Sequence, residues 1–363
     1  MGGSSKLVKL GLIGCGRVAE TRHLPALASL PQAQVVAVAD IDPERLKTVA
    51  DTFRIEHRYP DFQNLLSNST IDAVAICVPA QFHVEVALTA LDAGKHLFIE
   101  KPLALSLDEA DQLIERASRS PVQAMVGFNL RGHRLVQQAR EIIRQGMLGT
   151  LELIRTALTS DTRYDANAPE WRKRREQGGG ALFEIAVHHF DLWRFLLQSE
   201  VEEVFATSRS GEWEDQTTTV TARMANGALS SAVISESTGI SNELDIYGHT
   251  GHLHASLYCF DGLQFSPVSR CPGDARTRLA RIIQVAKEIP QAVSAIRQGG
   301  VWCASYQTQW RHFIDCIQQT RPVGCTLEDG RRTLQVALAA AKSASLRQPV
   351  KVTEAPRTIP PVA

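Results

Sequence analysis

The chain has 363 residues, more than one hydrophobic core usually organises, so we expect two domains. Apolar residues make up 44% and charged residues 21%, which is typical of folded globular proteins. Lys plus Arg number 39, as do Asp plus Glu, so no bulk positive charge exists to attract nucleic acid or an anionic membrane. The seven cysteines are scattered and no apolar stretch reaches about 18 residues, so we expect reduced thiols in a cytoplasmic protein with no membrane partner.

A glycine-rich turn follows the first apolar segment. Residues 7–13 are apolar, GCGRVA occupies 14–19, and apolar residues then recur with helical spacing. In a dinucleotide site, Gly14 would permit the tight turn, Gly16 would let the backbone approach a pyrophosphate, and a small Ala19 would fit helix against strand. Since glycines also end ordinary strands, the turn alone does not establish such a site.

A second apolar segment, 35–39, ends at Asp40. An acidic side chain at this place can accept hydrogen bonds from the adenosine ribose hydroxyls and would repel a 2′-phosphate. Because Ile41 follows and not a basic residue, we predict NAD as the cofactor in preference to NADP. The other interpretation, in which Asp40 caps the next helix, is weaker because Asp42-Pro43 already supplies a helix start.

Strands and helices then alternate, with strands expected over 73–78, 95–99 and 122–128 and helices over 83–93 and 107–119. This predicts a doubly wound α/β Rossmann domain over 1–130, whose ligands bind beyond the carboxyl ends of the strands. From its position alone, Lys101 is either a salt-bridged surface group or a proton-transfer group. The predicted cofactor-binding residues are Gly14, Cys15, Gly16, Arg17, Val18, Asp40, Val78, Pro79, His83, Glu100, Lys101 and Asn129.

Further motifs extend along nearly the whole chain. They are ICVP at 76–79 followed by His83, GKH at 94–96, EKPLA at 100–104, GGGAL at 178–182, His188 with Asp191, and QWRHF at 309–313. Together they resemble the glucose-fructose oxidoreductase / inositol dehydrogenase (Gfo/Idh/MocA) family.

The resemblance implies an NAD-dependent oxidoreductase that interconverts a secondary alcohol and a ketone on a sugar, cyclitol or related polyol. In the family the lysine of Glu-Lys-Pro hydrogen-bonds the reacting oxygen and the histidine of the GGGAL segment is the acid/base, roles that fall on Lys101 and His188. The chemistry agrees, because the hydroxyl must lose its proton as the carbonyl forms and a cation stabilises the developing alkoxide. The likeness also implies a homodimer or homotetramer.

Glu184, His188 and Asp191 are spaced i, i+4 and i+7, which would stack them on one face of a helix and makes Glu184 a third catalytic candidate. In the alternative reading these three side chains face water and a different stripe is buried. That stripe consists of His189, Phe190, Trp193 and Leu197. No zinc-type ligand spacing is evident, so we predict no metal.

The sequence departs from the family pattern at two positions. The acidic residue four before the histidine is usually Asp and is here Glu184, and the glycine that follows in the pattern is replaced by Ala186. An extra methylene moves a carboxylate by about 1 Å or more, and placement errors of that size are costly in catalysis. Either the substrate differs, therefore, or Glu184 is an orienting group.

Two further segments supply substrate candidates. Trp171 and Arg172 resemble a family element near the nicotinamide, although the basic run 172–175 could be an ordinary exposed turn. Arg131 follows the last Rossmann strand, where it could line the cleft or pack at the core edge. The predicted substrate-binding residues are Lys101, Arg131, Trp171, Arg172, Glu184 and His188.

The second domain, 131–363, is expected to be α+β with a large, mostly antiparallel sheet. Its strands are predicted over 151–158, 204–208, 217–224, 228–235, 244–247 and 252–257. The helix of 180–197 would cover one face, leaving the other to solvent or to a second subunit. A hairpin turn, and not a metal site, is expected at His249, His252 and His254, and a helix broken at Pro290 over 274–297.

Two other functions stay open at this point. Some relatives use tightly held NAD transiently for glycoside hydrolysis, and a third possibility is a non-catalytic nucleotide sensor. Retention of both Lys101 and His188 argues against the sensor, because binding alone requires neither.

Overall fold

The computed structural model describes residues 6–161, 168–269 and 300–360, together with 274–276, 278, 279, 282, 283, 285, 286 and 288–290. These residues fall into two compact units. The first comprises 6–129 with Tyr306–Leu334, and the second comprises Leu130–Ser305 with Gln335–360. Residues 306–334 belong to the predicted second domain, whereas in the structure their contacts group them with the first unit. The functional assignment of the two domains stays a prediction.

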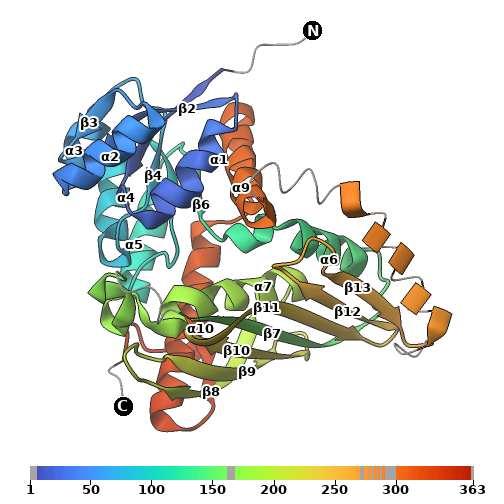
Figure 1. The fold of residues 1–363 in the computed structure, drawn as a ribbon. Helices are drawn as coiled ribbons and strands as arrows, with labels where there is room; N and C mark the ends of the chain where they lie inside the picture. The colour runs from blue at the N-terminus through green and yellow to red at the C-terminus, as the bar shows by residue number, and fades with distance from the viewer. Residues whose placement is uncertain are drawn as a thin grey trace. The chain divides into compact units, whose positions relative to one another are not determined.

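The first unit is built on a parallel sheet with strand order β3-β2-β1-β4-β5-β6 in the part of the chain described (Figure 1). The central strand β4 is wholly buried because both faces of the sheet are covered. Its strands are β1 Val8–Ile13, β2 Ala33–Ala39, β3 His57–Tyr59, β4 Ala73–Ile76, β5 His96–Ile99 and β6 Ala124–Val126.

Two of the longer helices of this unit, α2 and α5, begin at side chains that cap them. Asp42 accepts hydrogen bonds from the N–H groups of Glu44 and Arg45, and Ser106 forms a capping box with Glu109. The helices are α1 Leu24–Ala28, α2 Pro43–Phe53, α3 Phe62–Leu66, α4 His83–Asp92 and α5 Leu107–Ser118, with a π-helical turn η1 Ala19–His23 and 3-10 turns η2 Ala80–Phe82 and η3 Asn129–Gly132.

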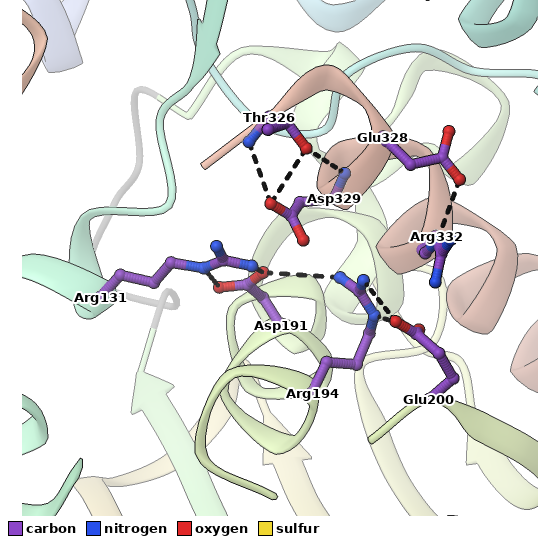
Figure 2. A network of polar contacts seen from close by, with 8 residues as sticks. All are labelled: Arg131, Asp191, Arg194, Glu200, Thr326, Glu328, Asp329 and Arg332. Carbon is purple, nitrogen blue, oxygen red and sulfur yellow. Dashed lines mark hydrogen bonds and ion pairs between the residues drawn. The ribbon is translucent and has the colours of Figure 1, made fainter. Parts of the chain in front are cut away.

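Two long helices, α9 Gly300–Gln319 and α10 Leu327–Leu346, contribute residues to both units. At the start of α10, Asp329 and Thr326 cap each other reciprocally, at 3.0 and 3.1 Å (Figure 2). Gly330 is required in the first turn, because a Cβ there would lie 3.0 Å from Leu103 and Val126.

The second unit carries an eight-stranded sheet in its described residues, with order β13-β12-β11-β7-β10-β9-β8-β14. Only the β10–β7 pair is parallel among the pairings of these strands, so the predicted mostly antiparallel sheet is confirmed. The strands are β7 Leu151–Asp161, β8 Val201–Arg209, β9 Thr217–Met224, β10 Leu229–Ser235, β11 Ser237–Gly248, β12 Gly251–Ser256, β13 Leu263–Pro267 and β14 Val350–Lys351.

In the part of the chain that the structure describes, helices cover one face of this sheet and leave the other open (Figure 1). The alternation of buried and exposed residues along β9 follows from this arrangement. The helical elements are α6 Arg134–Arg144, α7 Val187–Leu197, the π-helical turn η7 Leu182–Ala186, and 3-10 turns η5 Glu170–Lys173, η6 Arg175–Gln177 and η8 Val352–Glu354. The predicted helix over 274–297 lies largely outside the described residues.

Candidate active site

The glycine turn after β1 has the backbone shape that a pyrophosphate requires. Gly14 has φ of 92°, and a Cβ there would lie 2.7 Å from the carbonyl of Cys77. At Gly16, in contrast, a Cβ would meet nothing within 4 Å, so the chain is open to a close approach. The helix begins at Arg17, and the N–H groups in the first turn of a helix are suited to bind a phosphate.

Asp40 braces this turn from the neighbouring strand β2. Its Oδ2 accepts a hydrogen bond from the Cys15 N–H at 2.7 Å, and its Oδ1 accepts one from the Asp42 N–H at 2.8 Å. The Arg45 guanidinium lies 3.8 Å from Oδ2. Because Asp42 caps α2, the alternative role of Asp40 as that cap is wrong. Cys15 contributes its main chain only, since burial, with the nearby Asp40 charge, raises the pKa of its thiol to about 12.

These features fit a dinucleotide. The open Gly16, the helix start at Arg17 and Val18, and an acidic side chain at the end of β2 are the parts that hold a pyrophosphate and an adenosine ribose in doubly wound sheets.

The carboxyl ends of β4 and β5 supply the rest of this rim. His83 is buried beside the turn of Val78 and Pro79, and its ring nitrogens lie 2.8 Å from the Pro102 carbonyl and 2.9 Å from the Val78 carbonyl. Burial lowers the pKa of His83. The ring therefore ties the turn after β4 to the segment that carries Lys101.

Lys101 lies at the same sheet edge as the glycine turn. Ile13, Ile76 and Ile99 are register partners on three neighbouring parallel strands, so the residues that follow them leave the sheet together. Strands lie about 4.8 Å apart, which places the end of β5 about 10 Å from Gly14. Lys101 is half-buried, and Asn129 at the end of the domain is fully buried.

In the second unit, Glu184 forms an ion pair with Arg172. The Arg172 Nε and Nη2 atoms lie 3.2 and 3.1 Å from Glu184 Oε1, and the guanidinium carbon lies 5.4 Å from the centre of the Trp213 ring. Glu184 and Arg172 have side chains that are 15% and 20% exposed. The longer reach of glutamate is thus used to contact an arginine from the η5 turn that also carries Trp171.

Asp191 anchors α7 through a chain of ion pairs (Figure 2). Its carboxylate accepts two hydrogen bonds from Arg131, at 2.8 and 2.6 Å, and lies 4.0 Å from Arg194. Arg194 in turn donates to Glu200 at 2.6 and 3.0 Å. Asp191 is 1% exposed, so the alternative in which it faces water is wrong.

His188 is half-buried on α7, whereas the neighbouring His189 is fully buried. The three ionisable groups that were expected on one α-helix lie in two different elements. Glu184 is in the π-helical turn η7, whereas His188 and Asp191 are in α7. The reading of 172–175 as an exposed turn also fails, because Arg175 is buried against Asp215, with Nε 2.7 Å from Oδ2.

Comparison with known proteins decides the family. Residues 8–128 match the description "Oxidoreductase family, NAD-binding Rossmann fold", and residues 136–254 match the GFO/IDH/MocA C-terminal domain. The chain belongs to the Gfo/Idh/MocA family. It is an oxidoreductase with NAD as its cofactor.

Relatives match this Gfo/Idh/MocA chain along most of its length. The myo-inositol 2-dehydrogenase of Thermotoga maritima is 27% identical, with 96% of this chain and 99% of the relative covered. The levoglucosan dehydrogenase of Pseudarthrobacter phenanthrenivorans is 29% identical, with 71% and 75% covered. A solved levoglucosan dehydrogenase, in complex with NADH and levoglucosan, matches the fold with a TM-score of 0.81 at 23% identity, covering 97% and 100% of the two chains.

The histidine cluster at 249–254 lies at and after the predicted hairpin turn. His249 lies in the predicted hairpin turn, whereas His252 and His254 lie on β12 and contact the Asp245 carboxylate at 3.1 and 2.9 Å. Within the described ranges no group of three or more His, Cys, Asp or Glu side chains is arranged to hold a metal ion. Of the helices described, none is long and apolar enough to cross a membrane.

Sequence reasoning missed two groups of this Gfo/Idh/MocA chain. Trp213 lies beneath Arg172, and His23 is bonded to both Glu100 and Trp310 inside the first unit. His23 stands four residues after the GCGRVA turn and Trp310 is part of the QWRHF motif, but nothing in the sequence indicates that they meet.

Proposed function

We propose that this protein oxidises a secondary alcohol on a sugar, cyclitol or related polyol to a ketone, or catalyses the reverse reduction. The observation that carries the proposal is the placement of Lys101 at the sheet edge that also carries the glycine turn. NAD, when bound, supplies the hydride acceptor. The names of the relatives support the substrate class, since they act on myo-inositol and levoglucosan.

In the proposed reaction Lys101 hydrogen-bonds the reacting oxygen and stabilises its developing negative charge. His188 takes the hydroxyl proton, a task that suits a neutral imidazole near pH 7. Glu184, already bound to Arg172, orients substrate contacts together with Arg131 and Trp171. Asp40 accepts hydrogen bonds from the adenosine ribose hydroxyls. Because its carboxylate would repel a 2′-phosphate, it favours NAD over NADP.

The test is a screen for NADH formation with inositols, aldoses, sugar acids and nucleotide sugars, with Lys101→Ala as the control. We expect NADH to accumulate with one class of polyol and the signal to vanish in the control. Glycoside cleavage without NADH would favour the hydrolase, and tight NAD binding without turnover of any substrate would favour the sensor.

We also propose that the protein is a cytoplasmic homodimer or homotetramer that associates through the open sheet face. Phe205, Leu229 and Val233 are 40%, 54% and 45% exposed on this face. Isolated apolar residues are common on surfaces, but these three lie on β8 and β10, the two strands that flank β9, and so gather in one region of the sheet. Light scattering would test this proposal by measuring the molar mass of the Leu229→Arg and Val233→Arg variants. We expect both variants to dissociate into smaller assemblies than the wild type.

A further inference from the structure

His23 is a buried histidine that the proposed reaction leaves without a role. It ends the π-helical turn η1, is 0% exposed, and packs edge-on against three aromatic rings. Its ring centre lies 5.4 Å from that of Phe98, 5.2 Å from Tyr306 and 5.7 Å from Trp310. Burying an imidazole in such surroundings costs free energy unless its nitrogens are hydrogen-bonded.

Both ring nitrogens of His23 have partners, and the partners fix the position of the proton. The Trp310 indole nitrogen lies 3.0 Å from Nδ1, and an indole N–H can only donate. Nδ1 must therefore accept, so the ring proton is on Nε2, which donates to Glu100 Oε1 at 2.8 Å. A proton on Nδ1 would face the indole proton directly, so the partners favour the tautomer with its proton on Nε2.

Glu100 connects this histidine to the lysine that follows it. Its Oε2 accepts a hydrogen bond from the Lys101 N–H at 3.2 Å, and the residue is 5% exposed. Burial raises the pKa of Glu100, whereas the hydrogen bond from His23 and the positive charge of Lys101 lower it. Gly127 leaves room for the carboxylate, because a Cβ there would lie 3.1 Å from Oε1.

We propose that His23 is a positioning residue of the enzyme, which together with Trp310 holds the Glu100 carboxylate in one orientation beside Lys101. This inference rests on the proposed role of Lys101. A lysine that hydrogen-bonds a reacting oxygen is positioned more accurately when a nearby carboxylate is itself held in one orientation. Small placement errors are costly in catalysis, and charges interact strongly in a buried setting. The other titratable group that acts on Glu100 is His83, whose pKa is lowered by burial and whose ring nitrogens lie against the carbonyls of Val78 and Pro102.

The first test reads the tautomer directly. Nitrogen-15 NMR of the full-length protein, labelled at histidine and saturated with NADH, should show His23 protonated at Nε2 only. The signal is assigned by its loss in His23→Leu. A proton on Nδ1 would overturn the proposal.

The second test removes the indole donor and keeps an aromatic ring. Trp310→Phe should lower kcat about tenfold while the Kd for NAD changes by less than about twofold. Trp193→Phe is the matched control, since Trp193 is also fully buried and its indole N–H also donates, to Thr156 Oγ1 at 3.3 Å. If Trp310→Phe and Trp193→Phe lose the same thermal stability and the same fraction of kcat, the role of Trp310 is structural only.

The third test asks whether His23 acts through Glu100. His23→Leu should lower kcat in the native background, and His23→Gln, which keeps a donor near Nε2, should recover part of it. In a Glu100→Gln background His23→Leu should cost nothing further, whereas additive losses would overturn the proposal. Undiminished activity of Lys101→Ala would instead remove the proposed role of Lys101, an outcome separate from the NMR result.

Discussion

The cofactor edge of the first unit and the helix α7 of the second unit position their functional groups by different means. At the cofactor edge the main chain determines the shape of the site. Gly14 occupies a turn that has no room for a Cβ, and Asp40 accepts hydrogen bonds from backbone N–H groups. At α7 and the preceding turn η7, long charged side chains hold residues in place, as in the pairs Arg172–Glu184 and Arg131–Asp191. A main-chain site resists substitution, whereas a site built from ion pairs can be altered one side chain at a time.

The comparison is tested most strongly at Lys101. Lys101→Ala should lower kcat by a factor of about 100 or more, because the stabilisation of the developing alkoxide is lost. The Kd for NAD, measured by titration calorimetry, should stay unchanged because the glycine turn is intact. Loss of NAD binding would show that side chains, and not the main chain alone, hold the cofactor at this edge.

Buried His189 in α7 should make the second unit sensitive to acid. Burial lowers its pKa from 6.5 to about 4, so below about pH 6.5 the unfolded chain takes up the proton first. Its contribution to stability should be full above pH 6.5 and should fall by about 3 kcal/mol as the pH drops to about 4. Urea unfolding of wild type and His189→Phe across this range should show a weaker pH dependence in the variant, and identical slopes would refute the assignment.

Asp40→Ala tests whether the bracing carboxylate also selects the cofactor. Discrimination against NADP, measured as the ratio of kcat/KM values, should fall about tenfold or more because the repulsion of a 2′-phosphate is removed. Asp42→Ala is the control: it removes the cap of α2 and should cost about 1 kcal/mol of stability without changing the ratio. Unchanged discrimination in Asp40→Ala would remove Asp40 from the adenosine site.

The smallest effect is expected at Glu184. Glu184→Asp shortens the side chain and breaks its contact with Arg172, so kcat/KM for the polyol should fall about tenfold with NAD affinity unaffected. Glu141→Asp provides a surface control, since Glu141 forms an exposed pair with Arg144. If Glu184→Asp raises kcat/KM, the glutamate is a substrate-specificity feature and not an orienting group.

The local parts of this structure could be predicted from sequence. Apolar segments indicated most strands of both sheets but not the short strands β3, β13 and β14, and Asp42-Pro43 marked the start of α2. The partners of buried polar groups could not be predicted, because Trp310 is 287 residues from His23 and Asp191 is 60 residues from Arg131. Periodicity also misled at 182–186, since the i, i+4 spacing assumes an α-helix and this turn is π-helical.

That wide turn has a consequence for how the sequence can change. A π-helical turn holds one more residue than an α-helical turn, so it is equivalent to a single-residue insertion in an otherwise regular helix. Deleting one residue within Leu182–Ala186 would leave a continuous helix and rotate the preceding segment by about 100° relative to α7. Glu184 would then leave its place beside Arg172 while His188 stayed where it is. Length variation at this point would therefore change the surroundings of Glu184 and leave those of His188 in place.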